Sequence, residues 1–311
     1  MSVARRLLPL LALLSQSAAQ SLRAEDSETP IKVDVDVVNI LCNVYDKNGA
    51  LKQDLDKGDF EVLENGRRQE IRYFARDTDL PLTVALLVDV SGSVRWMIDS
   101  EKDAATAFLE GVLRPADQAL LLGFSSTIIL WQDFTPSTEL LRSALERLHP
   151  IPFRGLPAIG QPMPGTLLYD AVFTTAAKKL VNVAGRKAMV IISDGLDNGS
   201  LIHMEEAIRA LQATNTIVYG VCYESGFSGC AFLKEMSEPT GGRTFTAGKK
   251  VPLSKIFQII QDELRSQYSL GYISANRAHD GSYRKLQVKV HGRGLRVQAR
   301  KGYFAAIDKH G

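Results

Sequence analysis

The feature that most constrains the fold is the apolar run at residues 82–88, which is followed by Asp89, Ser91 and Ser93. An unbroken apolar run of this length is typical of a strand that is buried on both faces of a parallel sheet. The three oxygen-bearing side chains come at alternate positions, where such a strand gives way to a loop. Because hard cations such as Mg²⁺ prefer oxygen ligands, this strand end is a candidate cation site.

Two further stretches can complete a set of ligands. Thr166 follows Gly165 just before a helical pattern at residues 167–181, and Asp194 follows a second apolar run at residues 188–193. Open α/β folds bind their ligands at the carboxyl ends of the strands, so these side chains are expected at one edge of a sheet. The alternative is that they cap helices or form simple turns. Capping would explain single members of the set but not their shared edge.

In chain order, Asp-x-Ser-x-Ser, Gly-Thr and Ser-Asp-Gly resemble the metal-ion-dependent adhesion site (MIDAS) of von Willebrand factor type A domains. Residues 233–246, with Thr240-Gly-Gly-Arg243, also resemble the later part of that domain. The resemblance implies a Rossmann-like, doubly wound and mostly parallel α/β sheet that binds Mg²⁺, with Mn²⁺ or Ca²⁺ as alternatives. The implied metal ligands are the hydroxyls of Ser91, Ser93 and Thr166 and the carboxylates of Asp89 and Asp194, the latter two directly or through water.

The pattern of predicted strands and helices divides the chain into an α/β part and two β segments. Residues 82–266 alternate strand and helix, with strands at 82–89, 119–124, 187–193 and 216–223 and an antiparallel edge strand at 127–131. The flanking segments 31–74 and 268–299 have β character, with Asn-Gly turn signals at Asn48 and Asn65 that favour hairpins. Neither end holds enough strands for a stable domain. We therefore expect a type A domain at 81–267, inserted into a β-sandwich formed by 31–80 and 268–304. Across 31–304 the chain resembles secreted bacterial proteins of the type A family.

The first residues predict export. Arg5 and Arg6 precede an apolar stretch at 7–14, and Ser17-Ala18-Ala19 provides a small-residue cleavage site. We expect a signal peptide at 1–19, cleaved near Ala19, and a secreted or periplasmic protein with no membrane span in its mature chain. The apolar stretch is far shorter than the roughly 20 residues that span a bilayer. The arginine pair leaves open whether the general or the twin-arginine route is used.

Cysteines and charge add two constraints. In an oxidising compartment Cys222 and Cys230 could form a disulfide, with Cys42 as a small buried side chain, but three unbridged thiols are equally consistent with the sequence. The 37 basic and 35 acidic residues give a net charge of +2, which gives no argument for binding nucleic acid.

These observations predict an exported binding or adhesion-type protein without catalytic residues. Three neutral hydroxyls and two carboxylates leave a divalent cation under-neutralised, so a protein partner is expected to supply an acidic side chain. One alternative is a metal-dependent phosphotransferase-like or hydrolase-like enzyme, since Asp89 faintly resembles the nucleophile of haloacid-dehalogenase-like enzymes. Ser91 stands where those enzymes have their second acidic residue, and no Gly-x-Ser-x-Gly motif is present. The other alternative is a structural exported protein with a vestigial metal site.

Overall fold

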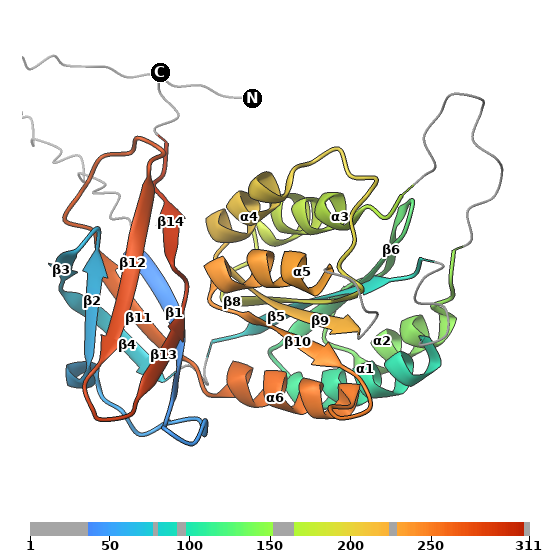
Figure 1. The fold of residues 1–311 in the computed structure, drawn as a ribbon, viewed down its shortest axis with the longest axis horizontal. Helices are drawn as coiled ribbons and strands as arrows, with labels where there is room; N and C mark the ends of the chain where they lie inside the picture. The colour runs from blue at the N-terminus through green and yellow to red at the C-terminus, as the bar shows by residue number, and fades with distance from the viewer. Residues whose placement is uncertain (1–36, 77–79, 92–97, 152–164, 224–228, 308–311) are drawn as a thin grey trace, which may run out of the picture. The chain divides into compact units, whose positions relative to one another are not determined.

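The structure is a computed structural model that describes residues 37–76, 80–91, 98–151, 165–223 and 229–307. At the centre of its α/β part is a six-stranded sheet with the strand order β10-β9-β8-β5-β6-β7 (Figure 1). The strands are β5 (Leu82–Asp89), β6 (Gln118–Phe124), β7 (Ile128–Thr135), β8 (Arg186–Ser193), β9 (Thr216–Tyr223) and β10 (Arg243–Ala247). All neighbours pair in parallel except β6 and β7, which are antiparallel. The predicted mostly parallel α/β sheet is confirmed.

Helices cover both faces of this sheet (Figure 1). One face carries α1 (Ile98–Val112), α2 (Thr138–Arg147) and α6 (Leu253–Arg265). The other carries α3 (Leu168–Thr174), which continues as the π-helical segment η3 (Thr175–Leu180), then α4 (Met204–Ala213) and α5 (Gly229–Ser237), which leads into the 3-10 turn η4 (Glu238–Thr240). Strand β5 is buried along its whole length, because Val84 and Leu86 pack into one core cluster and Ala85 and Leu87 into the other. This two-sided burial explains why its sequence is an unbroken apolar run.

The remaining strands form two antiparallel sheets of four strands each, with the orders β13-β1-β11-β4 and β14-β12-β2-β3. Their bounds are β1 (Val37–Tyr45), β2 (Phe60–Glu64), β3 (Arg67–Gln69), β4 (Ile71–Arg76), β11 (Tyr268–Ile273), β12 (Tyr283–Val290), β13 (Arg296–Ala299) and β14 (Gly302–Phe304), with a 3-10 turn η1 (Lys57–Asp59) before β2. Each sheet contains strands from both ends of the chain: β1 pairs with β11 and β13 in the first sheet, and β2 pairs with β12 in the second. The prediction that flanking strands form a shared sandwich is therefore confirmed as part of the fold class.

The two Asn-Gly signals have different outcomes. Asn65 and Gly66, with φ angles of 48° and 80°, form the two-residue turn that joins β2 to β3, as the sequence predicts. The turn expected at Asn48 forms, but the chain that follows it pairs with β1 only through an isolated antiparallel bridge between Tyr45 and Leu51, so the hairpin is reduced to a single bridge. Strand β11 pairs with β1 only as far as Cys42, and beyond it the Lys52 amide donates to the Val44 carbonyl at 2.8 Å, so the returning chain covers only the last residues of this edge.

The sandwich and the α/β part are in contact. The described residues from 37 to 307 belong to one compact unit, and Leu41 of β1 packs in the same apolar cluster as Leu264 of α6. The side chain of Gln298 donates to the carbonyl of Gly241 at 3.0 Å. The predicted signal peptide lies outside the described residues. Among the helices that the structure describes, none combines the length and apolar character needed to cross a membrane.

Candidate metal site

Asp89 is the last residue of β5 and is 1% exposed. Its neighbour on the adjacent strand is Ser193, the last residue of β8, which is fully buried. The Ser193 hydroxyl donates to Asp89 Oδ2 at 2.7 Å and accepts a hydrogen bond from the Gly195 amide at 2.9 Å. The Ser91 amide donates to Asp89 Oδ1 at 2.9 Å. One hydroxyl therefore ties the carboxylate of Asp89 to the backbone that carries Asp194.

The electrostatics of this strand end favour a cation. Burial raises the pKa of Asp89 from 3.8 to about 6, and the nearby charge of Asp194 contributes in the same direction, while hydrogen bonds from Ser91 and Ser193 lower it. Both causes that raise the pKa are penalties on a buried negative charge. A bound cation would offset both of them. The carboxylate and hydroxyl oxygens gathered at this edge therefore fit a hard divalent ion such as Mg²⁺.

Asp194 begins the loop that follows β8, and this loop forms hydrogen bonds with Thr166. Asp194 is 8% exposed and accepts the Leu196 amide at 3.0 Å through Oδ1. Four residues after Asp194, Asn198 accepts the Thr166 amide at 2.6 Å through its side-chain oxygen, and its own amide donates to the Thr166 carbonyl at 3.3 Å. On the other side, the Leu167 amide donates to the carbonyl of Ser125, just after β6, at 2.9 Å. The loop after β8 and the end of β6 together hold Thr166.

Four of the five residues that the sequence predicts as ligands thus lie at the carboxyl end of the parallel strands. These are Asp89, Ser91, Thr166 and Asp194. Ser93 lies outside the described residues. In the described part of the chain no group of three His, Cys, Asp or Glu side chains could hold a metal, so the predicted site depends on hydroxyl ligands beside its two carboxylates. That these residues bind an ion remains a prediction.

The sequence did not predict that two further residues of this edge, Ser193 and Asn198, orient the proposed ligands. The sequence does mark the position of Ser193, since it is a polar residue at the end of an apolar run, immediately before Asp194. No sequence pattern marks Asn198, because its role depends on the close approach of the loop after β8 to the loop before α3. Gly165 permits that approach: a Cβ at this position would lie 2.1 Å from the side-chain oxygen of Asn198.

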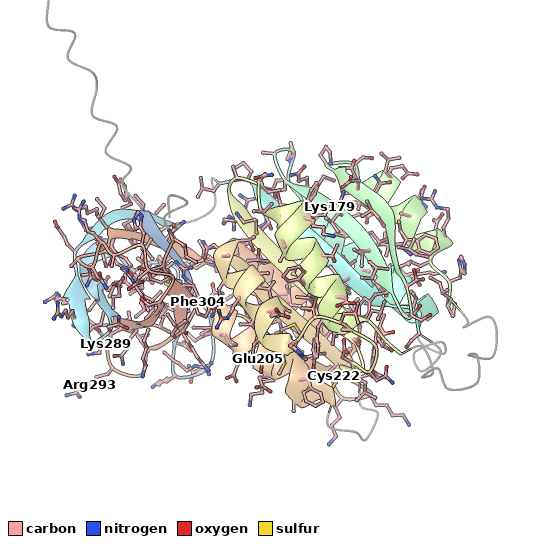
Figure 2. The ribbon with its side chains drawn as sticks, turned by 90° about the horizontal axis from the view of Figure 1, so that it is seen from above. Lys179, Glu205, Cys222, Lys289, Arg293 and Phe304 are labelled. Atoms are coloured by element: carbon pink, nitrogen blue, oxygen red, sulfur yellow. A yellow bond between two sulfur atoms is a disulfide. The ribbon has the colours of Figure 1, made fainter. Side chains whose placement is uncertain are left out.

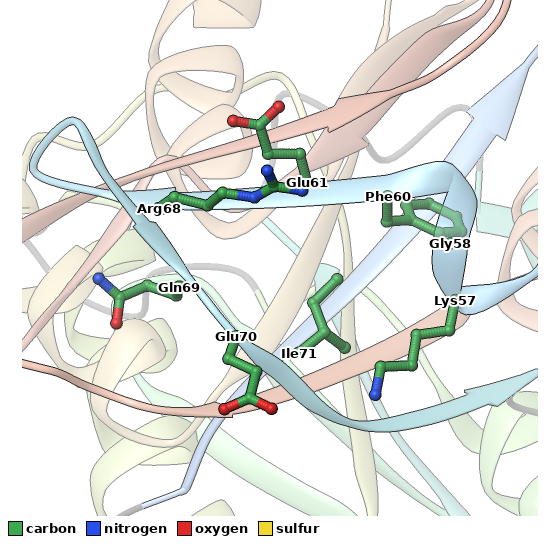
Figure 3. Close-up of a pocket in the computed structure, with 8 residues that line it drawn as sticks. All are labelled: Lys57, Gly58, Phe60, Glu61, Arg68, Gln69, Glu70 and Ile71. Carbon is green, nitrogen blue, oxygen red and sulfur yellow. The ribbon is translucent and has the colours of Figure 1, made fainter.

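A groove in the sandwich is separate from this edge. It is lined by residues of η1, β2, β3 and β4 and the link between β3 and β4, among them Lys57, Glu61, Arg68 and Glu70 (Figure 3). Two basic and two acidic side chains surround it, so it has no dominant charge. None of its lining residues belongs to the predicted ligand set.

The comparisons with known proteins agree with this architecture. Residues 84–196, which include Asp89, Thr166 and Asp194, match the family model of the von Willebrand factor type A domain. Among solved structures, the chain is similar to proximal thread matrix protein 1 from the mussel byssus, with a TM-score of 0.51 and 15% identity over 74% of this chain and 50% of that chain. A structure of the same protein with a zinc-occupied MIDAS motif gives a TM-score of 0.51 and 16% identity over 65% of this chain and 49% of that chain.

This chain therefore spans about half the length of the mussel protein. At these identities the likeness shows the fold alone. A search of curated protein sequences gave no significant match.

Proposed function

Because the chain contains a von Willebrand factor type A domain, we propose that it is a binding protein whose central sheet holds a divalent cation at its carboxyl edge. The ligands are Asp89, Ser91, Ser93, Thr166 and Asp194, and the ion is Mg²⁺, with Mn²⁺ or Ca²⁺ as alternatives. The observation that carries the proposal is the Ser193 hydroxyl, which joins the Asp89 carboxylate to the backbone next to Asp194. The zinc-occupied MIDAS of the structurally similar mussel protein supports a divalent ion at such an edge.

The same ligand set suggests what the ion does. When bound, the cation supplies a centre that attracts an anionic oxygen, because three neutral hydroxyls and two carboxylates leave it short of negative charge. Asp89 is buried and is oriented by the Ser193 hydroxyl, so it holds the ion in place rather than contacts a partner. Thr166 is only half-buried and lies in the loop just before α3. We propose that a protein partner places an acidic side chain on the ion next to Thr166.

The cysteines support a proposal about where the protein is located. The structure joins Cys222 and Cys230 in a disulfide, which is one of the two alternatives that the sequence leaves open, and Cys42 is not in a disulfide. Disulfides persist in oxidising compartments. Together with the predicted signal peptide at residues 1–19, this supports a secreted or periplasmic location.

Calorimetric titration of the purified protein with MgCl₂, MnCl₂ and CaCl₂ tests the metal site. We expect one ion per chain for the wild type and no binding for Asp89→Ala, because Asp89 is the buried carboxylate that the proposal makes a ligand. Circular dichroism checks that the variant is folded. A wild type that binds none of the three ions, or an Asp89→Ala variant that binds them as well as the wild type, would contradict the proposal.

The role of the ion in partner binding needs a second experiment. Immobilised protein is exposed to an extract of its own compartment in Mg²⁺ or in EDTA, and captured proteins are identified by mass spectrometry. Thr166→Ala should reduce capture more than it reduces Mg²⁺ binding, since it removes the hydroxyl beside the open coordination position. Capture that survives both EDTA and Asp89→Ala shows that partners use another surface.

A further inference from the structure

We infer that the Cys222–Cys230 disulfide positions Asp194 for metal binding, an inference that rests on the function proposed above. The bridge joins the end of β9 to the first turn of α5, with the two Cα atoms 5.5 Å apart (Figure 2). Neither cysteine belongs to the predicted ligand set. The disulfide lies beside the proposed ligand Asp194, and this position gives it a role beyond general stability.

The first observation is the place of Cys222 in the sheet. It is fully buried and pairs with Ser193 in the parallel ladder between β8 and β9. Its sulfur lies 3.9 Å from the carbonyl oxygen of Asp194. The bridge is therefore next to both the ligand Asp194 and the serine that links it to Asp89.

The second observation is the contact between two glycines. A Cβ added at Gly229, the first residue of α5, would lie 2.0 Å from the Asp194 carbonyl oxygen, and one added at Gly195 would lie 2.1 Å from the Gly229 carbonyl oxygen. Gly195 also has a φ of +80°, which favours glycine. The backbone of the first turn of α5 thus packs directly against the backbone of Asp194 and Gly195. Any movement of this turn changes the support of Asp194.

The third observation is how the first turn of α5 is held. The buried residues of α5 are Gly229, Leu233, Met236 and Ser237. Because Gly229 has no side chain, the fully buried side-chain packing of this helix begins at Leu233, four residues further along. Cys230 is half-buried against the same apolar cluster that contains Cys222. The covalent bond to Cys222 therefore anchors the turn that abuts Asp194, while Leu233 and Met236 anchor the rest of the helix.

The test compares Mg²⁺ affinity with and without the bridge, using the metal alone as the probe. The double variant Cys222→Ser/Cys230→Ser is titrated with MgCl₂ beside oxidised wild type. The matched control is Cys42→Ser, which changes a buried cysteine of β1 in the sandwich. Residues that orient metal ligands typically change affinity by 10–100-fold, so we expect the dissociation constant to rise about tenfold in the double variant and to stay unchanged in Cys42→Ser.

A second experiment compares reduced with oxidised wild-type protein, so it does not depend on the double variant being folded. A phosphine reductant, with one water molecule, converts the wild-type bridge into two thiols: the water supplies both thiol hydrogens and the oxygen of the phosphine oxide. The reductant is removed under argon before titration. Reduced wild type should show the same loss of affinity. In the metal-free protein, the amides of Gly195 and Leu196, which are bonded to Ser193 and to the Asp194 carboxylate, should exchange their hydrogens faster after reduction.

The outcomes separate this inference from the proposed function. If oxidised wild type binds Mg²⁺ and the reduced protein or the double variant binds it equally well, the inference is wrong and the metal site stands. If Cys42→Ser loses as much affinity as the double variant, the effect is general destabilisation, which also overturns the inference. If oxidised wild type binds none of Mg²⁺, Mn²⁺ and Ca²⁺, the proposed function fails and the inference fails with it; if it binds only Mn²⁺ or Ca²⁺, that ion replaces Mg²⁺ as the probe.

Discussion

Ser193 offers the sharpest test at the scale of single residues. It is fully buried, and its hydroxyl bonds both the Asp89 carboxylate and the Gly195 amide. Ser193→Ala leaves both groups without this partner, so we expect a loss of about 1–3 kcal/mol in the free energy of unfolding. Because the serine also orients two proposed ligands, Mg²⁺ affinity should fall about tenfold. Denaturant unfolding and calorimetric titration measure the two effects.

Ser237→Ala is the matched control for that variant. Ser237 is also fully buried, but its hydroxyl bonds the Lys234 carbonyl and the Thr244 hydroxyl, away from the proposed ligands. It should destabilise the fold to a similar extent without changing Mg²⁺ affinity. Equal losses of affinity in both variants would show that Ser193 acts through stability alone.

The sequence predicts the carboxylates of this edge better than the residues that orient them. Asp89 and Asp194 each follow an apolar run, and a charged residue in that place has a strong local signal. Ser193 becomes important only because β8 lies beside β5 and its last residue faces Asp89. That relation depends on the strand order, which a local pattern does not contain.

At the scale of elements, the loop after β8 is the part that holds Thr166. Asn198 bonds the Thr166 backbone through both its side chain and its amide, at 2.6 and 3.3 Å. Asn198→Ala removes the side-chain bond, so we expect Mg²⁺ affinity to fall by up to about tenfold with little change in thermal stability, because Asn198 is exposed. Titration with MgCl₂ and thermal unfolding check this.

Ser200→Ala gives the comparison within the same loop. Its hydroxyl accepts the Asp170 amide at 3.0 Å and bonds Asp197 at 2.5 Å, so it fixes the start of α3 rather than Thr166. We expect a smaller effect on Mg²⁺ binding than for Asn198→Ala. The reverse order would show that the start of α3, and not the Thr166 contact, controls the site.

The four central parallel strands, β5, β6, β8 and β9, are predicted closely because they are buried on both faces. The expected ranges 82–89 and 216–223 are those of β5 and β9, and the other two parallel strands begin one residue earlier than expected. The edge strand β7 runs to Thr135 rather than to residue 131, since its half-exposed, polar end has no apolar run to mark it. The helical pattern at 167–181 gives no sign that α3 widens into a π-helical segment.

At the scale of the whole molecule, the sequence predicts that the two chain ends share a sandwich but not how. The prediction depends on a simple count, since neither end has enough strands to be stable. The register of the strand pairs cannot be predicted in this way. Val37 pairs with Ile273, more than 200 residues away, and no local sequence pattern specifies such a pair. The boundaries at 31–80, 81–267 and 268–304 remain predictions about folding units.

The last prediction is that the sandwich and the α/β part unfold together. Leu41 of β1 is 4% exposed and packs in the apolar cluster that contains Ile260 and Leu264 of α6. The hydrogen bond from Gln298 to Gly241 and the ion pair between Lys301 and Glu238 at 2.8 Å also link the two parts, but exposed pairs contribute little, whereas Leu41 packs in the apolar core of the α/β part. Leu41→Ala should therefore lower the free energy of unfolding by about 2–5 kcal/mol. Calorimetry of the wild type should show one transition, and the variant should shift all of it. Two transitions, of which Leu41→Ala moves only one, would mean that the parts fold independently.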